Sequence, residues 1–242
     1  MKNPTQTPLT NALNVDFNDT NKIWLTNSRT LRKVIGILGM GLPLLLFLFL
    51  YIDNGMLSPL ESISHYYYTR VSSIFVGTLA VLGVFFIIYK GKEPVDFFVS
   101  MAAGIFVLCV ACFPTSNLTD QAGDPLPYSV TTLTASPFRE AFHYASAGIF
   151  LACLAYMSLF LFTKSDKLPS HRGSQKKTRN RIYRVCGVLM IIAMLVIGAG
   201  AVGLIPHTFY REYCLTYWME TLAVESFGFS WLVKGEALFD DE

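Results

Sequence analysis

The residues best suited to chemistry in this sequence are histidines and carboxylates in three short polar stretches. The stretches are 61-ESISHYYYTR-70, 138-FREAFHYASAG-148 and 217-YWMETLAVES-226. Imidazole and carboxylate groups exchange protons near neutral pH, and both can also bind zinc. The candidate polar residues of these stretches are Glu61, Ser64, His65, Arg70, Arg139, Glu140, His143, Glu220 and Glu225. Whether their side chains can act together depends on the elements that carry them.

The composition around these stretches is typical of a membrane protein. The chain has 242 residues, of which 52% are hydrophobic and 15% charged, and its mean hydropathy is +0.44. Soluble proteins average about 25% charged residues. The charges are also clustered, and they leave apolar runs close to the roughly 18 residues expected of a transmembrane helix. We predict six spans, at residues 34–52, 71–89, 97–113, 141–162, 185–204 and 217–233.

Six spans fill most of the chain and predict an all-α fold, a polytopic membrane helix bundle in a single domain. In this scheme residues 1–33 form a polar N-terminal tail, 34–234 the transmembrane domain and 235–242 a short acidic tail. The N-terminal tail lacks the charged, apolar and small-residue regions of a signal peptide. We therefore expect this tail to stay in the cytoplasm.

Lysine and arginine concentrate in alternate loops, which predicts how the chain is threaded. With the N-terminus in the cytoplasm, sixteen of the nineteen basic residues fall in cytoplasmic segments, and Arg70, Arg139 and Arg211 lie outside. Cytoplasmic loops of membrane proteins carry such an excess. The pattern predicts that both termini are cytoplasmic. Because the basic residues are explained by this threading, the net charge of +2 does not indicate binding to nucleic acid. We expect membrane lipids and membrane proteins as partners, and no nucleic acid.

In this topology all three polar stretches lie at the extracytoplasmic ends of spans. If the second helix begins just after residue 59, Glu61 and His65 are four residues apart and share a helix face. Glu140 and His143 share a face in the same way at the start of the fourth span. Charged groups inside a bilayer are costly and normally face the bundle interior. We therefore expect the candidate polar residues to line a pocket that opens to the outside.

The two glutamates of the last span differ in their expected depth. Glu225 stands at the middle of the span, and we expect it to be more deeply buried than Glu220. Arg70 and Arg139 are expected as outer anchors that pair with Glu61 or Glu140. An alternative for the whole set is a structural role, in which the polar groups hydrogen-bond to one another and join the helices.

Three classes of function remain open for such a pocket. We favour a non-enzymatic binding, sensor or accessory-subunit role, in which the polar groups join helices. A zinc-dependent hydrolase acting on a lipid-like substrate would use His65, His143 and Glu225 as metal ligands, with Glu61 or Glu140 as substitutes for Glu225. A proton- or cation-coupled transporter would use the carboxylates. A haem held by the two histidines is a further alternative.

Five strings of the sequence resemble an uncharacterised family of six-span bacterial membrane proteins. The strings are SHYYYT, CFPT, FHYASAG, YRVCGVLM and ESFGFSWLVKGE, and the resemblance covers residues 31–236. This resemblance implies a location in the bacterial cytoplasmic (inner) membrane and no particular activity. A weaker likeness links the chain to the seven-helix alkaline-ceramidase and adiponectin-receptor hydrolases. Those proteins carry an H-x-x-x-H pair that this sequence lacks, so their zinc site does not carry over.

Overall fold

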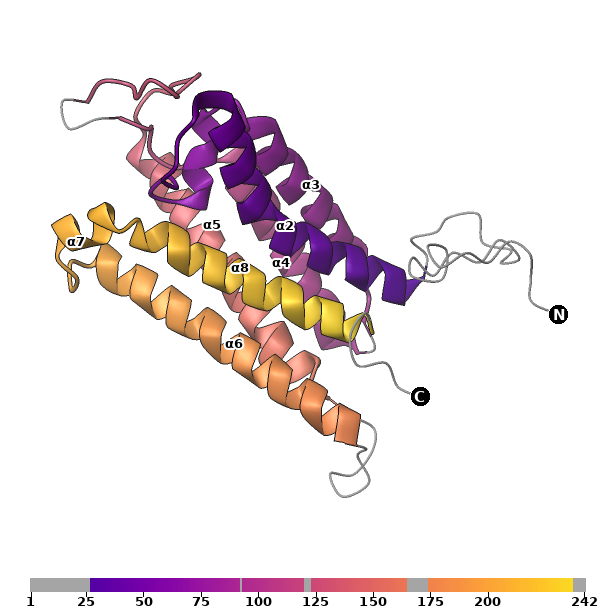
Figure 1. Cartoon of the computed structure of the whole chain (residues 1–242). Coiled ribbons are helices and arrows are strands. Elements are labelled where there is room, and N and C mark those ends of the chain that lie inside the picture. Colours follow the sequence, from indigo (N-terminus) through magenta and orange to yellow (C-terminus); the bar gives the residue numbers. More distant parts are fainter. Residues whose placement is uncertain (1–26, 92, 120–122, 165–173, 237–242) are drawn as a thin grey trace.

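The computed structural model describes residues 27–91, 93–119, 123–164 and 174–236 (Figure 1). Apart from an isolated bridge between Thr119 and Pro125, the regular elements of these residues are helices, which confirms the predicted all-α class. The elements are α2 (Ser28–Asn54), the 3-10 helix η2 (Ile63–Tyr68), α3 (Ser72–Ile88), α4 (Pro94–Cys112), α5 (Pro137–Tyr156), the π-helix η3 (Met157–Leu161), α6 (Ser174–Ala201), α7 (His207–Glu212) and α8 (Leu215–Lys234). Most of the two predicted tails, 1–26 and 237–242, lies outside the described residues.

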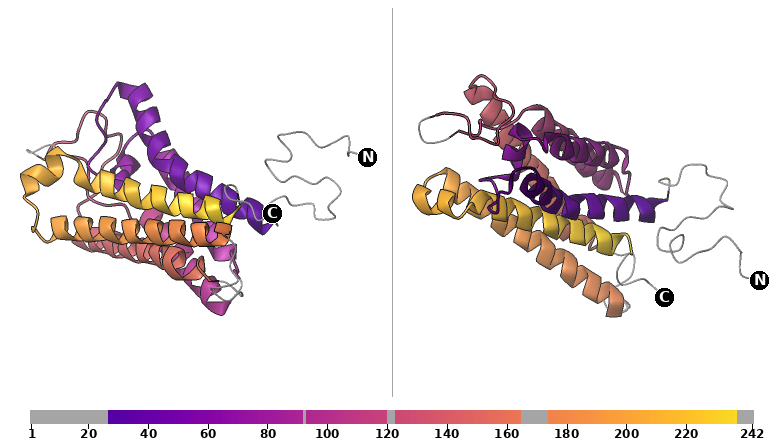
Figure 2. Two further views of the ribbon diagram at one scale, coloured as in Figure 1. Left: turned by 60° about the horizontal axis from the view of Figure 1, so that its bottom comes forward. Right: turned by 45° about the horizontal axis from the view of Figure 1, so that its top comes forward.

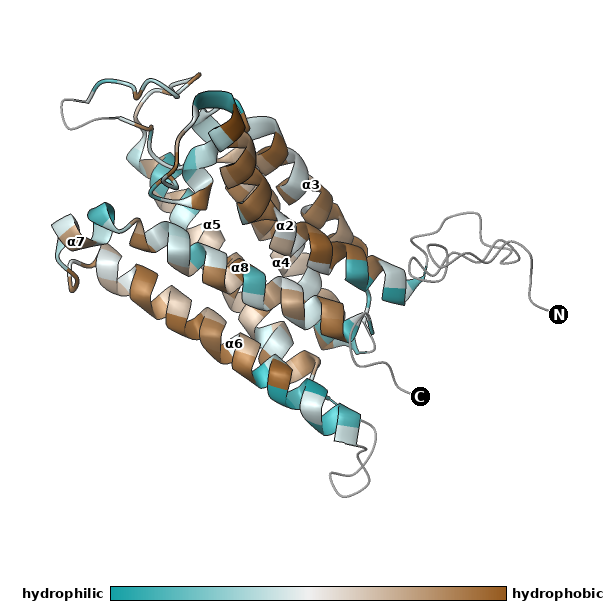
Figure 3. Ribbon diagram, viewed as in Figure 1, coloured by the Kyte–Doolittle hydropathy of each residue, from teal (hydrophilic) through white to brown (hydrophobic). Residues whose placement is uncertain are grey.

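Four helical segments are long and apolar enough to cross a membrane, which indicates a membrane location. They are α2, α4, α6 and the continuous segment Pro137–Leu161, in which α5 runs into η3. The apolar helix α3 has 17 residues, and the 20 residues of α8 include Glu220 and Glu225. These helices coincide with the six predicted apolar runs. Figure 3 shows hydrophobic residues along the middle of the bundle, and apolar side chains such as Leu195, 68% exposed, face outward from it.

Local sequence determines where several helices begin. The side chain of Asn27 caps α2 by accepting a hydrogen bond of 2.9 Å from the N–H of Arg29. Glu93 and Asp96 form a reciprocal capping box at the first turn of α4. Such side chains satisfy N–H groups that have no partner inside the helix. The helix α6 begins at Ser174, eleven residues before the predicted run at 185–204, so the polar stretch that precedes this run is helical as well.

The helix α3 agrees with the predicted run at residues 71–89, but no α-helix extends back from it to residue 59. Instead of a helix from just after residue 59, the chain forms an irregular stretch, then η2, and then α3 from Ser72. Ser62 caps η2 by accepting a hydrogen bond of 3.1 Å from the N–H of Ser64. Glu61 therefore lies outside any helix and does not share a helix face with His65. The prediction is wrong because contacts with distant segments hold this stretch, and local residue spacing cannot reveal them.

Glycines let neighbouring helices approach closely. A Cβ atom on Gly228 of α8 would lie 2.8 Å from the carbonyl oxygen of Gly36 in α2. A Cβ atom on Gly104 of α4 would lie 2.7 Å from the carbonyl oxygen of Gly83 in α3. Such small-residue contacts are typical of helix pairs in membranes. They hold α8 against α2 and α4 against α3.

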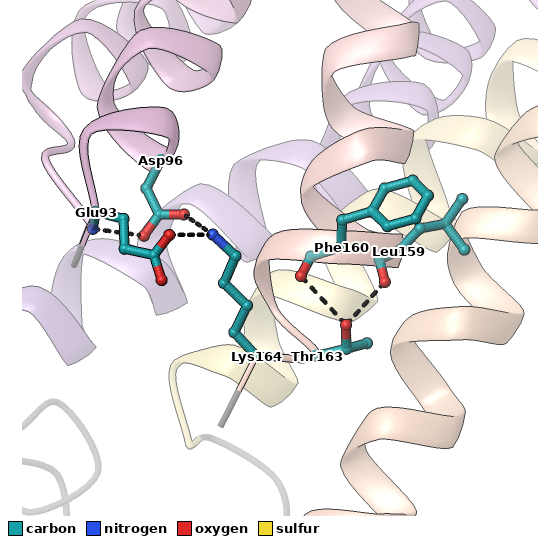
Figure 4. Close-up of polar contacts among 6 residues, drawn as sticks. All are labelled: Glu93, Asp96, Leu159, Phe160, Thr163 and Lys164. Atoms are coloured by element: carbon teal, nitrogen blue, oxygen red, sulfur yellow. Dashed lines mark hydrogen bonds and ion pairs between the residues drawn. The ribbon is translucent and has the colours of Figure 1, made fainter. Parts of the chain in front are cut away.

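One end of the bundle carries many of the basic side chains, and we call it the basic end. It comprises the beginnings of α2 and α6, the connection between α3 and α4, and the last turns of η3 and α8 (Figures 1 and 2). Here Arg29 forms an ion pair of 2.9 Å with Glu236. Lys164 lies 2.5 Å from a carboxylate oxygen of Glu93 and 3.9 Å from Asp96 (Figure 4).

The buried core near the basic end is aromatic. Trp231 of α8 is 0% exposed. The centre of its ring lies 5.0 to 5.9 Å from the ring centres of Phe86, Tyr89, Phe162 and Phe227. Aromatic pairs at these distances add to the free energy of burial. The cluster fixes α8 against α3 and the end of η3.

The π-helix η3 forms the last turns of the segment that begins with α5. Its Leu159 packs over Gly187 of α6, where a Cβ atom on the glycine would lie 2.3 Å from the leucine side chain. The hydroxyl of Ser158 donates a hydrogen bond of 3.1 Å to the carbonyl oxygen of Tyr183. Thr163 ends the turn by donating to the carbonyl oxygen of Leu159 at 2.8 Å (Figure 4). These contacts hold the segment against α6.

Candidate functional site

Eight of the nine candidate polar residues lie at the opposite end of the bundle, which we call the polar end. It comprises α7, the connections 55–71 and 113–136, and the helix ends attached to them (Figures 1 and 2). Arg211 on α7 donates from Nε and Nη2 to the same carboxylate oxygen of Glu61, at 2.9 and 2.7 Å. The carbonyl oxygen of Glu61 accepts a hydrogen bond of 3.0 Å from the N–H of Tyr217 in α8. Glu61 thus ties the connection 55–71 to both α7 and α8.

The carboxylate of Glu220 holds the beginning of η2. The hydroxyl of Ser62 lies 2.8 Å from its Oε2 atom, and the N–H of Ile63 donates to the same oxygen at 2.7 Å. The expectation that Glu225 is the more enclosed of the two glutamates is wrong, because Glu220 is surrounded by protein and by these donors. Five residues advance a helix by about 500°, so the two side chains leave α8 in different directions.

The imidazole of His143 joins η2 to the end of α4. Its Nδ1 atom lies 2.7 Å from the carbonyl oxygen of Phe113, and its Nε2 atom lies 3.0 Å from the hydroxyl oxygen of Ser64. A carbonyl oxygen can only accept, so Nδ1 carries the proton and Nε2 accepts from the serine hydroxyl. His143 is 2% exposed and Ser64 is 7% exposed. The arrangement fits a buried tie between helices, and it also fits a serine nucleophile with its general base.

The side chain of His65 is half-buried beside this pair. Its Nδ1 atom is buried without a hydrogen-bond partner among the residues that the structure describes. Burial lowers the pKa of His65 from 6.5 to about 4; the charge of Glu61 opposes this shift, while His143 and Arg211 add to it. His65 is therefore neutral at pH 7, as is typical of a histidine kept away from water.

The predicted anchors find other partners than the predicted glutamates. Arg70 is exposed, and its Nε atom lies 3.7 Å from a carboxylate oxygen of Asp53 at the end of α2. Arg139 donates to two backbone carbonyl oxygens of the connection 113–136, at 3.2 and 2.8 Å. Glu140 is half-buried in the first turn of α5. The prediction of pairing with these glutamates is wrong because backbone carbonyls and Asp53 lie within reach of the arginines.

The predicted metal ligands His65, His143 and Glu225 do not form a zinc site. Within the described ranges, no three side chains of histidine, cysteine, aspartate or glutamate lie together so that they could hold a metal ion. Both ring nitrogens of His143 already have hydrogen-bond partners, so it has no free nitrogen for zinc or for haem iron. The residues present therefore fit neither group.

A cavity of about 450 Å³ lies between α2, α6 and α8, and we call it the lateral groove. Its lining residues are Met40, Arg181, Ile182, Val185, Cys186, Leu189, Glu225, Ser226 and Phe229. Glu225 was predicted to line a pocket with the other candidate polar residues, but it lies in this groove instead. One signal could have indicated the groove: Arg181, Val185 and Leu189 recur every four residues and therefore share a face of α6.

No family model, curated protein or solved structure matches the chain. The resemblance to a six-span bacterial family stays a prediction.

Proposed function

We propose that the protein is a six-span membrane protein with a non-enzymatic binding role, as an accessory subunit of a membrane complex. Four helical segments are long enough to cross by themselves. At 1.5 Å per residue, α3 is about 26 Å long and α8 about 30 Å long, close to the roughly 30 Å thickness of the hydrocarbon core. A shortfall of a few ångströms in α3 costs little, because the bilayer can thin locally.

The charges along the bundle support an orientation with both termini in the cytoplasm. The basic end includes Arg29, Lys164 and Lys234, and the basic segment that opens α6. The polar end has three arginines in its connections and helix ends. Cytoplasmic loops carry the excess of basic residues in membrane proteins. We place the protein in the bacterial inner membrane, with the six-span family that its sequence strings resemble.

The non-enzymatic role rests on the mutual pairing of the candidate polar residues. Glu61 pairs with Arg211, Glu220 accepts from Ser62, and His143 bridges two segments of the polar end. Each bond joins segments that are far apart in the sequence. Polar groups that satisfy one another in this way join helices in membranes. We therefore call these hydrogen-bonded contacts of the polar end, which hold the connections against the helix ends, the structural cap.

Alanine substitutions in the purified, detergent-solubilised protein test the structural cap. We expect the melting temperature to fall in Glu220→Ala and in His143→Ala, because each change leaves buried donors or acceptors without a partner. Glu212→Ala is the matched control, since Glu212 is exposed on α7. An unchanged or raised melting temperature in both buried variants would contradict the proposal, because residues kept for catalysis or binding often lower stability.

The proposed orientation has its own test. Alkaline phosphatase requires disulfide bonds, which form outside the cytoplasm. We expect an inactive enzyme when it is fused after residue 236 and an active enzyme when it is fused within the connection 123–136. The reverse pattern would overturn the orientation.

A second candidate function is a serine hydrolase, and it rests on the contact between Ser64 and His143. The fixed tautomer leaves Nε2 of His143 ready to accept the hydroxyl proton, while the carbonyl oxygen of Phe113 orients the ring. In such a step the serine oxygen bonds to an acyl carbon of an ester, the proton moves to Nε2, and the departing alcohol then takes that proton. A lipid ester is the substrate class that suits a membrane protein.

Covalent labelling decides between the two candidates. A fluorophosphonate probe reacts with activated serines, so a hydrolase should be labelled in the wild type and not in Ser64→Ala. Ser158→Ala is a suitable control, because Ser158 is buried at the basic end and donates only to a backbone oxygen. Absence of labelling at Ser64 in wild-type protein in lipid vesicles would exclude the hydrolase.

A further inference from the structure

The lateral groove runs along the side of the bundle, where α8 lies between α2 and α6 (Figure 1). On α6, Arg181, Val185 and Leu189 form one face that extends about 12 Å along the helix. Across the groove, α8 supplies Glu225 from its middle. The groove thus has apolar walls, a basic side chain toward the basic end and a carboxyl group halfway along a bilayer-length helix.

Glu225 is the one member of the candidate polar residues in this groove. It accepts no hydrogen bond and forms no ion pair with another described residue. Glu61 and Glu220, in contrast, each accept hydrogen bonds at the polar end. Ionisable groups at the centre of a bilayer are costly and normally pair with another group. A partner for Glu225 is therefore expected from outside this part of the chain.

Lipids cannot supply that partner at this depth. Acyl chains carry neither a hydrogen-bond donor nor a charge, and the polar groups of a phospholipid lie near the helix ends. A second copy of the chain offers no basic groove residue at this depth, because copies related by a two-fold axis along the membrane normal keep each residue at its own depth, and Arg181 lies nearer the basic end. A helix of another protein can present a basic side chain at any depth, and such polar contacts join helices in membranes.

We propose that the lateral groove binds a transmembrane helix of a partner protein, and that a lysine or arginine of this helix pairs with Glu225. The inference rests on the proposed accessory-subunit role and specifies the chemistry of the partner. Arg181 adds selectivity, because it favours an acidic side chain of the partner at the basic end and disfavours a basic one there. The groove volume lies within the range of ordinary binding pockets, so it can accept side chains of such a helix.

Synthetic helices of defined sequence test the proposal without an identified partner. The probes are leucine-rich peptides of about 20 residues, one with a lysine at its centre and one with leucine there. The full-length protein is reconstituted in phosphatidylcholine vesicles, and energy transfer between labelled protein and peptide reports binding. We expect the lysine peptide to bind about threefold to tenfold more tightly than the leucine peptide. Glu225→Gln should remove most of this difference.

Two tryptophan substitutions on α6 provide a matched pair for the location of the site. Val185 lines the groove and is 53% exposed, whereas Val188 is 49% exposed and lies outside the groove lining. Both positions can take a larger side chain without disturbing the core. We expect Val185→Trp to weaken binding of the lysine peptide and Val188→Trp to leave it unchanged.

Several outcomes would overturn the proposal. Equal binding of the two peptides, or equal weakening by both tryptophan variants, would remove the groove as the docking site. Self-association of the wild-type protein that Glu225→Gln abolishes would assign the groove to a second copy. Displacement of the lysine peptide by phosphatidylglycerol would assign it to lipid. The peptide measurement does not depend on the side at which the termini lie, so a failure of the proposed orientation remains distinguishable.

Discussion

Ser62 and Glu220 stand 158 residues apart in the chain, and the serine hydroxyl lies 2.8 Å from the carboxylate oxygen Oε2. The N–H of Ile63 donates to the same oxygen. One side chain of α8 therefore organises the connection that leads into α3. A carboxylate enclosed by protein needs hydrogen-bond donors, and the N–H groups at the buried beginning of the 3-10 helix η2 need acceptors. The contact between Glu220 and the beginning of η2 satisfies both requirements.

A double-mutant cycle should show that these two residues act together. We expect Glu220→Ala to lower the free energy of unfolding by about 1–3 kcal/mol, because two donors lose their acceptor. Ser62→Ala should cost less, since Ile63 still donates to the carboxylate. The double variant should cost less than the sum of the single variants, by about 0.5 kcal/mol or more. Unfolding in detergent measures all four proteins, and strictly additive costs would contradict the coupling.

The ion pair between Glu61 and Arg211 should be worth less, although its geometry is good. The two side chains are 44% and 59% exposed, so solvent screens their attraction. We expect Arg211→Gln to lower the free energy of unfolding by less than about 1 kcal/mol. The loss should shrink further at high salt, which screens exposed charges. A larger loss of unfolding free energy that does not depend on salt would contradict the prediction, because it would show that the ion pair is shielded from solvent.

Burial of His65 should make stability depend on pH. The folded protein lowers the pKa of this histidine from 6.5 to about 4, so the unfolded chain binds a proton that the folded chain resists. The contribution is complete above about pH 6.5 and is lost as the pH falls toward 4. Melting temperatures between pH 4 and 7 should fall less steeply in His65→Gln than in the wild type. Parallel curves for the two proteins would exclude His65 as the cause.

Close approach of α2 and α8 should make Gly228 intolerant of a larger residue. A Cβ atom there would lie 2.4 Å from the Met40 side chain and 2.8 Å from the carbonyl oxygen of Gly36. We expect Gly228→Ala to destabilise the protein by about 1–3 kcal/mol. Gly198→Ala is the control: this helical glycine has nothing within 4 Å of an added Cβ, and alanine favours helix. Thermal unfolding should therefore separate the two variants.

The sequence predicted the helices well because the length of an apolar run is a strong and local signal. All six runs became helices, with Leu215–Lys234 enclosing the run that carries two glutamates. The ends of the helices were predicted less accurately. The polar opening of α6 is helical beyond the predicted span, and the stretch before Ser72 is not α-helical at all. In both cases contacts or propensities that hydropathy does not measure decided the outcome.

The partners of the candidate polar residues could not be predicted in the same way. Position along the helices placed the three polar stretches at one end of the bundle, and the structure joins Ser64 to His143 and the 61–63 stretch to α8. Pairing across 150 residues, as between Glu61 and Arg211, depends on the direction of each side chain. Residue spacing within one helix gives no information on how side chains of separate segments are directed toward one another. For the same reason residue spacing did not predict that Glu225 lies in the lateral groove, away from the other candidate polar residues.

The π-helix at Met157–Leu161 gives this segment one residue more than a continuous α-helix would need for the same number of turns. A π turn holds about one residue more than an α turn, so deleting one residue there would restore continuous α-helix and leave the chain beyond it in nearly the same direction. Lys164 would then stay close to Glu93, and Thr163 would still end the segment. Single-residue deletions should be tolerated better here than in a purely α-helical segment, where each deletion turns the chain beyond it by about 100°.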